Sequence, residues 1–325
     1  MPGLLIIAES AGGQLAPTTL ELAGEGRRLA DQLKQPLAAL LAGTNVARGA
    51  EGLGEHGVDQ VLLADDGGPG STSPQWLLAT AEQAAKRIAP EIILLTHSTA
   101  GRELGPALAY RLNSGIVTDC TALRLEDSRL VITKPVYGGS AISEQMVVTS
   151  PQMATLRPRA FEAGQPQAGR QAQVEQLSVS VSDSPVQVLE EVRETAAEGP
   201  RLKDARIVIS GGRGLGGPEN WHYVEELAQV LGAAVGATRA VTDAGWVPPT
   251  LQVGLTGATI APDLYITVGI SGAVQHIAGI SGARNVVAIN RDRDANIFKY
   301  ARYGVAGDWK QVVPAFIQRL KELRR

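Results

Sequence analysis

The sequence predicts an α/β protein of two domains, the first with an antiparallel extension and the second doubly wound. Short continuous apolar runs bounded by turn residues are typical of strands that a parallel sheet buries on both faces. Segments with apolar residues at helical spacing alternate with these runs, which indicates successive β-α units. The chain has 325 residues, enough for two domains of ordinary size.

The first half of the chain contains four of these apolar runs and two clear helices. The helices are predicted over 18–33 and 75–88, and Ser73 followed by Pro74 is a typical start signal for the second. The strands are predicted at Leu4–Ala8, 37–41, 61–64 and Ile92–Thr96.

From residue 116 the pattern changes to strands without intervening helices. A turn at Tyr137–Gly139 separates two of them, so this stretch is predicted to be an antiparallel extension of the first domain. The segment 192–203 has the composition of a linker, so the domains are predicted as 1–195 and 196–325. The strands of the extension are predicted at 117–125, 130–136, 145–148 and 174–181.

A second β-α alternation follows the linker. Helices are predicted over 219–231 and 309–325, and Pro314 is tolerated only if it lies in the first turn of the second helix. The strands of this domain are predicted at 206–210, 233–236, Leu264–Val268 and 286–289.

Composition argues against several classes of function. Lys and Arg number 30 against 33 Asp and Glu, and aromatic residues make up only 4%, so no nucleic-acid partner is expected. No apolar run approaches the roughly 18 residues of a transmembrane helix, so the chain is not expected to be an integral membrane protein. Cys120 is the single cysteine, with no partner for an internal disulfide and no motif that marks a reactive thiol. This favours a reducing, cytoplasmic location.

A glycine-rich loop at 210–217 is the first candidate binding feature. It follows a predicted strand and precedes a predicted helix, so its backbone could approach a phosphate, which Arg213 could also meet. Its glycines satisfy the pattern G-x-G-x-x-G. The next strand lacks the terminal acid of a dinucleotide fingerprint, because Asp243 lies several residues later. A tight turn without a ligand stays open as an alternative.

Two further loops place polar side chains between glycines. In 251–257, Thr256 could hydrogen-bond a ligand or cap a helix. In 268–276, a Gly-Ser-Gly turn opens a helix that carries His276, and such a helix start suits a phosphate. A lone histidine on a helix is usually structural, so both readings of His276 stay open.

Two polar residues near the end of the chain are further candidates. Asn290 follows a predicted strand and Asp308 precedes the last helix, so each could recognise a base or ribose. Asp308 could equally be a helix N-cap. The sequence has no pattern typical of a metal site, of hydrolysis or of group transfer, so no catalytic residue is predicted.

Together these segments resemble the alpha subunit of the electron-transfer flavoprotein family. The match covers almost all of 205–313 and is specific as an ordered set. It runs through Ser210-Gly-Gly-Arg-Gly-Leu215, Gly236-Ala-Thr-Arg239, Asp243-Ala-Gly245, Gln252-Val-Gly254, Ile270-Ser-Gly-Ala-Val-Gln-His276, Val287-Ala-Ile-Asn290, Tyr303-Gly304 and Asp308. The first domain is similar to the family's N-terminal domain more loosely, through Thr96-His97-Ser98, Gly101-Arg102, Asn113-Ser-Gly115, Asp119-Cys120 and Arg157-Pro158-Arg159.

The resemblance implies that FAD is bound almost wholly by a Rossmann-like C-terminal domain. It implies that Arg213 lies by the diphosphate, that Arg239 lies close to the isoalloxazine ring, and that Thr256 lies near its N5 edge. It implies that His276 reaches the O2 side of the ring and that the last residues of the set contact the adenosine end. The implied set is Arg213, Thr238, Arg239, Val253, Gly254, Leu255, Thr256, Ser271, Gly272, Ala273, Val274, Gln275, His276, Asn290, Asp308 and Trp309.

Electrostatics agrees with this placement. Positive groups beside N1 and O2 of the ring stabilise the negative charge that reduction places there, and Arg239 and His276 are suitable residue types. Many family members carry Gln where this chain has Leu255. The resemblance therefore does not predict redox behaviour that depends on the Gln side chain. It still predicts FAD binding.

The resemblance also implies partners. It implies a heterodimer with a beta subunit contacted by the first domain, electron donors such as acyl-CoA dehydrogenases of fatty acid β-oxidation, and a membrane-associated quinone oxidoreductase or similar acceptor. The chain is then an electron carrier rather than an enzyme. Two alternatives are an NAD-dependent dehydrogenase, suggested by the glycine loop alone, and a non-redox FAD-binding module, which would bind flavin without cycling it.

Overall fold

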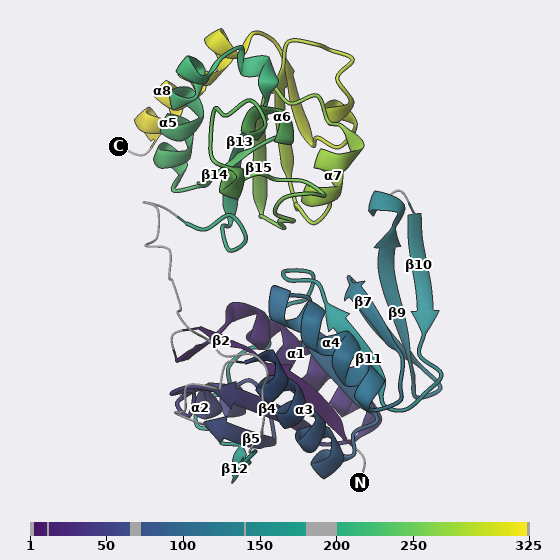
Figure 1. Cartoon of the computed structure of the whole chain (residues 1–325). Coiled ribbons are helices and arrows are strands. Elements are labelled where there is room, and N and C mark those ends of the chain that lie inside the picture. The colour runs from purple at the N-terminus through teal and green to yellow at the C-terminus, as the bar shows by residue number, and fades with distance from the viewer. Residues whose placement is uncertain (1–2, 12, 66–72, 140, 180–199, 324–325) are drawn as a thin grey trace. The chain divides into compact units, whose positions relative to one another are not determined.

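The structure is a computed structural model, and it describes residues 3–11, 13–65, 73–139, 141–179 and 200–323 (Figure 1). The chain forms two compact units. Of the described residues, those up to 136 and those in 141–179 belong to the first unit, and residues 137–139 and 200–323 belong to the second. The predicted linker falls mostly on 180–199, outside the described residues. The predicted boundary between 195 and 196 therefore stays a prediction.

The first unit is built on a seven-stranded sheet in which every neighbouring pair of strands is parallel. The strand order is β12-β5-β4-β1-β6-β11-β7. The strands are β1 (Leu4–Ala8), β4 (Leu37–Gly43), β5 (Gln60–Asp65), β6 (Ile92–Thr96), β7 (Ile116–Cys120), β11 (Gln152–Leu156) and β12 (Gln173–Gln176).

Helices cover both faces of this sheet. Residues of α1 and α2 pack with Leu4 and Ile6 of β1 on one face, and residues of α3 and α4 pack with Leu5 and Ile7 on the other. The Ser73 hydroxyl accepts a hydrogen bond from the Trp76 N–H and caps α3, as the start signal predicts. The helices are α1 (Pro17–Leu33), α2 (Gly49–Glu55), α3 (Pro74–Ile88) and α4 (Thr99–Arg111).

The antiparallel extension is confirmed as a three-stranded sheet of β8 (Ala122–Glu126), β9 (Arg129–Val136) and β10 (Ala141–Met146). The prediction of which strands belong to this sheet is partly wrong. The segment predicted as one strand at 117–125 divides into β7 and β8, with Asp119 at a positive φ of 64°. The strand predicted at 174–181 is β12, which pairs with β5 of the parallel sheet. The strand predicted at 145–148 is β10, which begins earlier.

The second unit is a five-stranded parallel sheet of order β14-β13-β15-β16-β17, flanked by helices on both faces. Helices α5 and α8 lie side by side over one face, and α7 covers the other (Figure 1). The doubly wound prediction is confirmed. The elements are β13 (Ile207–Gly211), α5 (His222–Leu231), β14 (Ala234–Ala237), α6 (Arg239–Thr242), β15 (Leu264–Val268), α7 (Val274–Ile280), β16 (Val286–Asn290), β17 (Tyr303–Ala306) and α8 (Trp309–Leu323).

Two details of the second unit differ from prediction. The helix predicted from residue 219 begins at His222, because a 3₁₀ turn occupies Pro218–Asn220. Pro314 is the sixth residue of α8 and so lies beyond its first turn. Proline has no N–H to donate to the carbonyl four residues earlier, that of Lys310, and Lys310 is exposed to water.

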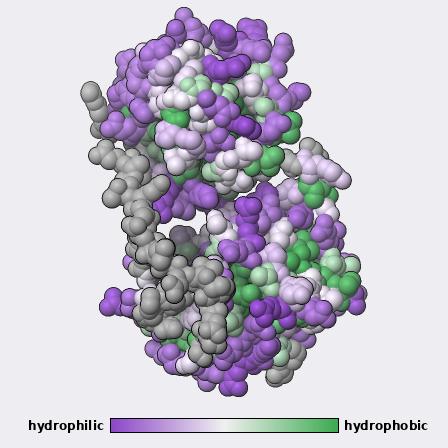
Figure 2. All heavy atoms as spheres, in the orientation of Figure 1, coloured by the Kyte–Doolittle hydropathy of each residue, from purple (hydrophilic) through white to green (hydrophobic). Residues whose placement is uncertain are grey.

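The viewed face of the molecule is mainly hydrophilic, with hydrophobic residues scattered over it (Figure 2). No helix in the described ranges is long and apolar enough to cross a membrane.

Candidate functional site

The site lies at the carboxyl edge of the second sheet, where the loops after β13 and β15 meet. The strand order reverses direction between these two neighbours, and doubly wound sheets bind ligands at such a switch point. The Gly212 N–H donates to the Val268 carbonyl at 2.9 Å, and the Gly214 N–H donates to the Gly269 carbonyl at 3.0 Å. The two predicted glycine loops therefore form one continuous surface.

Close packing of these loops explains why their glycines are needed. A Cβ atom on Gly212 would lie 2.3 Å from the Gly269 oxygen, and one on Gly214 would lie 2.7 Å from it. Gly269 itself has a φ of 66°, a conformation that favours glycine. Part of the glycine pattern is thus a requirement of the loop-to-loop contact, independent of any ligand.

The loop after β15 presents free donors. Within the described residues, the N–H groups of Ser271, Gly272, Ala273 and Val274 donate no hydrogen bond. Gly272 has a φ of 81° and backs closely onto the Ile297 N–H, so no side chain fits there. Consecutive free N–H groups around such a turn bind anions.

The segment 252–256, which lies between β14 and β15 in the chain, is held on both sides. The Val253 N–H donates to the Ala237 carbonyl at 2.9 Å, and the Leu255 N–H donates to the Gln275 carbonyl at 2.7 Å. The Gln252 amide donates to the Thr256 hydroxyl oxygen at 3.0 Å. The Thr256 hydroxyl can therefore donate its own proton outward, and no helix begins there, which removes the predicted alternative of a cap.

Two arginines are exposed at this edge. Arg213 lies in the 3₁₀ turn of the first glycine loop, and Arg239 opens α6. The Arg239 Nε lies 3.2 Å from the Asp243 Oδ2, with 67% and 64% of the two side chains exposed. The positive charge of Arg239 is thus partly offset by a neighbour and screened by water.

His276 is placed differently from what the resemblance implies. Its ring is buried, and its Nδ1 lies 3.0 Å from the Val253 carbonyl while its Nε2 lies 2.9 Å from the Tyr265 hydroxyl. Burial lowers the pKa of His276 to about 4. A ring whose nitrogens both have partners inside the chain offers neither a hydrogen bond nor a positive charge to the O2 side of a flavin.

Two other predicted residues make contacts within the chain. The Asn290 amide donates to the Ile270 carbonyl at 2.8 Å, and its oxygen accepts from the Asp292 N–H. Asp308 accepts from the Lys310 N–H at the start of α8, which matches the N-cap alternative. These contacts tie loops together and use one of the two amide protons of Asn290 within the chain.

Trp309 and Thr238 are the last two predicted residues of the second unit, and only Trp309 contacts a glycine loop through its side chain. The buried Trp309 indole donates to the Gly214 carbonyl at 3.2 Å, so it holds the first glycine loop rather than lining the surface. Thr238 is half-buried at the start of α6, where its side chain makes no capping hydrogen bond.

The residues present fit FAD. Leu255 and Val274 are 65% and 56% exposed, and they provide apolar cover for a ring at an otherwise polar edge. The free N–H groups of Ser271 to Val274 and the exposed Arg213 suit a diphosphate. Donors for an anion and an apolar rim for a ring therefore lie on one edge.

Sequence reasoning missed two residues that shape this site. Tyr265 lies in an apolar strand and reads as core, and Gln252 is part of the match to the family but received no role in the predicted site. Its hydrogen bonds to Thr242 and Thr256 show how it shapes the segment. No pattern in the sequence signals the contact between Tyr265 and His276.

The corresponding edge of the first unit is closed by its own side chains. Its strand order reverses between β1 and β6, and there the Ser98 hydroxyl donates to the Glu9 carboxylate at 2.5 Å. Nearby, Arg157 binds both carboxylate oxygens of Asp119. Cys120 is buried and burial raises its pKa to about 12, so the thiol is unreactive at neutral pH.

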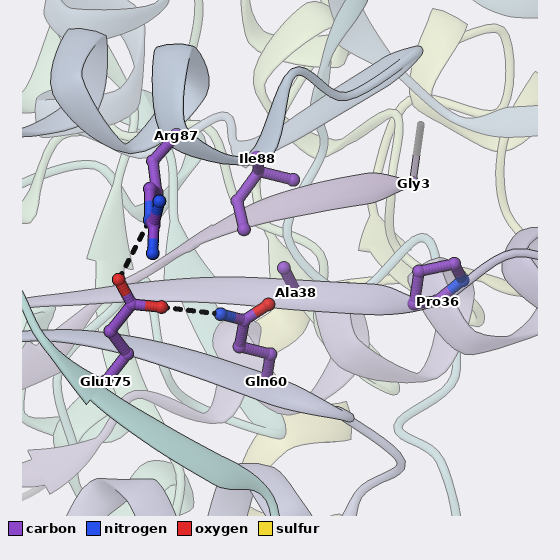
Figure 3. Close-up of a pocket in the computed structure, with 7 residues that line it drawn as sticks. All are labelled: Gly3, Pro36, Ala38, Gln60, Arg87, Ile88 and Glu175. Atoms are coloured by element: carbon purple, nitrogen blue, oxygen red, sulfur yellow. Dashed lines mark hydrogen bonds and ion pairs between the residues drawn. The ribbon is translucent and has the colours of Figure 1, made fainter. Parts of the chain in front are cut away.

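A pocket of about 200 Å³ opens at the opposite, amino edge of the first sheet (Figure 3). Glu175 accepts there from the Arg87 Nε at 2.9 Å and from the Gln60 amide at 2.9 Å, so its charge is already matched. Ligands of doubly wound sheets bind at the carboxyl edge, so this pocket is not the candidate site.

Comparison with known proteins finds matches to both units of the chain. Residues 4–182 match the family described as "Electron transfer flavoprotein domain", and residues 201–281 match "Electron transfer flavoprotein FAD-binding domain". The chain is 37% identical over 322 residues to "Electron transfer flavoprotein subunit alpha" of Thermoanaerobacterium thermosaccharolyticum, with 98% of each chain covered. It is 36% identical over 321 residues to the protein of that name in Bacillus subtilis, again with 98% of each covered. It is 39% identical over 326 residues to "Protein FixB" of Clostridium saccharobutylicum, covering 99% of this chain and 97% of that one.

Fold and site together define a two-unit α/β protein whose second, doubly wound sheet presents anion donors and an apolar rim at its carboxyl edge. The match to both family domains, across nearly the whole chain, makes the assignment specific. The chain belongs to the electron transfer flavoprotein alpha-subunit family, whose second domain binds FAD. The resemblance stated from the sequence, its FAD cofactor and its role in electron transfer are confirmed.

Proposed function

We propose that this chain is a redox carrier without catalytic activity of its own, and that it holds FAD at the carboxyl edge of β13, β14 and β15. FAD supplies the capacity to accept and release electrons. The residues of the chain bind it, orient it and set the charge around it. In this proposal the Ser271–Val274 N–H groups and Arg213 receive the diphosphate, while Arg239, Leu255 and Thr256 border the ring.

The observation that carries the proposal is the junction of the two glycine loops. Free N–H groups, an exposed arginine and exposed apolar side chains occur together there, within the stretch that matches the FAD-binding domain. An NAD-dependent dehydrogenase would need an acid at the end of β14, where this chain has Ala237 and Thr238.

We also propose a heterodimer with a beta subunit, formed in the cytoplasm and contacted by the first unit. The names of the relatives imply such a partner. The first unit exposes large apolar side chains on and after β10, namely Ile142, Met146 and Val148. Exposed apolar groups of this kind fit burial by another chain.

We further propose that the donors are flavoprotein dehydrogenases, such as the acyl-CoA dehydrogenases of fatty acid β-oxidation, and that a membrane-associated quinone oxidoreductase or a similar protein is the acceptor. The experiment is co-expression with the beta subunit, followed by FAD quantification and an assay of electron flow from a reduced dehydrogenase to a dye. We expect a yellow complex that is reduced by the dehydrogenase and reoxidised by the dye. Bound FAD that a dehydrogenase cannot reduce would support the non-redox alternative.

A further inference from the structure

Three side chains form a chain of hydrogen bonds between helix α6 and the segment 252–256. Thr242, a buried residue at the end of α6, has its hydroxyl oxygen 2.8 Å from the Gln252 Oε1. The Gln252 Nε2 lies 3.0 Å from the Thr256 Oγ1. The chain thus runs from a buried residue to Thr256, which is exposed beside Leu255 at the candidate site.

Two acceptors compete for the single hydroxyl proton of Thr242. The Arg239 carbonyl oxygen lies 3.0 Å from the Thr242 Oγ1, but it already accepts from the Asp243 N–H at 2.8 Å. The Gln252 Oε1 is closer, and no other group in the described ranges donates to it. The Arg239 carbonyl therefore has a donor without Thr242, whereas the amide oxygen depends on Thr242, which donates to it.

The primary amide carries this direction on to Thr256. With its oxygen turned to Thr242, Gln252 presents its NH₂ group to Thr256, and an N–H only donates. The Thr256 oxygen accepts that bond, so its own proton is directed away from Gln252. An amide rotated by 180° would reverse every bond: Thr242 would donate to the Arg239 carbonyl, and Thr256 would turn its proton inward to Oε1.

The backbone holds Gln252 and Thr256 in one tight turn. The Ala258 N–H donates to the Gln252 carbonyl at 2.7 Å. A Cβ atom on Gly257 would lie 2.3 Å from the same oxygen, so no side chain fits there. The separation of Gln252 and Thr256 is therefore set by the backbone, and the orientation of the amide is set by Thr242.

We propose that Gln252, oriented by Thr242, is a positioning residue for FAD, which turns the hydroxyl proton of Thr256 out of the chain and toward the cofactor. This inference rests on the proposed function, in which Thr256 borders the flavin ring. An O–H group that points at the ring stabilises the electron density that reduction adds there, so the orientation of one amide contributes to the reduction potential.

The test uses the full chain in complex with the beta subunit and the variant Thr242→Val, which removes the hydroxyl and keeps the branched shape. The Gln252 oxygen then has no donor, so the amide can rotate and accept from Thr256. We expect the dissociation constant for FAD to rise about 3- to 10-fold, as for one lost hydrogen bond, and the first reduction potential of bound FAD to fall. Thr242→Ser keeps the hydroxyl and should stay close to the wild type in both values.

Three further variants test the route. Gln252→Met removes the amide and should cause the same two losses, which keeps the inference testable if Thr242→Val does not fold. Because both residues act through Thr256, neither substitution should weaken FAD binding further in a Thr256→Val background. Thr259→Val removes an exposed hydroxyl later in the same segment and should leave both readouts unchanged.

NMR spectra of the complex, recorded before FAD is added, test the direction of the bonds. We expect cross-peaks from the Gln252 Nε2 protons to the Thr256 methyl group. Cross-peaks to the Thr242 methyl group instead would overturn the inference, as would unchanged FAD affinity and potential in Thr242→Val or Gln252→Met, or additive losses in the Thr256→Val background. Because these spectra need no FAD, failure of the wild type to bind FAD would contradict the proposed function and not the hydrogen-bond chain.

Discussion

Arg239 and Asp243 are the charged pair nearest to the proposed position of the flavin ring, and they should move its potential in opposite directions. We expect Arg239→Ala to lower the first reduction potential of bound FAD by about 40 mV, since a screened unit charge near the ring contributes on the order of 1 kcal/mol. Asp243→Asn should raise the potential, because it removes the negative charge 3.2 Å from the guanidinium. Spectroelectrochemical titration of the FAD complex measures both shifts.

Arg239→Lys is the matched control, because it keeps the charge and should stay near the wild-type potential. If Arg239→Ala retains FAD and titrates as the wild type does, Arg239 serves only its ion pair with Asp243.

The buried His276 should make stability depend on pH. Its pKa is about 4 in the folded chain, below the ordinary value of 6.5, so the unfolded chain takes up the proton first as the pH falls. The contribution is complete above pH 6.5 and is lost between pH 6.5 and 4, to a total of about 3 kcal/mol. Urea denaturation from pH 4 to 8 measures this loss. In His276→Asn the free energy of unfolding should depend less steeply on pH, because one proton fewer is taken up on unfolding. The same pH dependence in both proteins would refute the low pKa of His276.

At this scale the sequence located the polar residues but not their partners. The position of His276 near a glycine turn left a ligand contact and a structural role equally open, and in the structure the ring turns inward to Tyr265 and Val253. Sequence spacing places a residue on a helix but does not fix which way its side chain turns or what it meets. Asn290 and Trp309 show the same limit, since their contacts come from residues distant in the sequence.

Among the elements, the junction of the two glycine loops supports the most direct test. We expect Gly214→Ala to lose bound FAD and about 2 kcal/mol of stability, because the new Cβ would lie 2.7 Å from the Gly269 oxygen and force the loops apart. FAD content and denaturation midpoints of the purified complex measure the two effects.

Gly307→Ala is the control for this substitution. Its added Cβ would lie 3.4 Å from the nearest atom, Val312 Cγ2, so both FAD content and stability should stay close to those of the wild type. Full FAD occupancy in Gly214→Ala would mean that the loop junction does not shape the binding surface.

Buried strands were the elements that the sequence predicted best. Leu4–Ala8, Ile92–Thr96 and Leu264–Val268 begin and end where the apolar runs do, because a strand covered on both faces is apolar throughout. Helix α4 was missed because Gly101, Gly105 and Pro106 weaken the helical pattern. A Cβ on Gly101 would overlap the Thr96 oxygen, so tertiary packing imposes that glycine.

Across the whole molecule, the two sheets follow the same plan with different outcomes at their carboxyl edges. In the first unit, Glu9 and Ser98 close the switch point between β1 and β6 with their own hydrogen bond. In the second, the switch point between β13 and β15 offers free N–H groups and an exposed arginine. The glycine turns of the sequence predicted that the second unit binds the cofactor. The closure of the first edge could not be predicted, because it depends on a contact between residues 89 positions apart.

Hydrogen–deuterium exchange of the heterodimer, compared with and without FAD, tests most directly whether the second unit holds the cofactor. We predict that FAD slows exchange at 211–216, 238–239, 252–256 and 269–276, with little change at residues 3–11 and 96–102 of the first unit. Slowed exchange at the carboxyl edge of the first sheet, with none at the glycine-loop junction, would contradict the account.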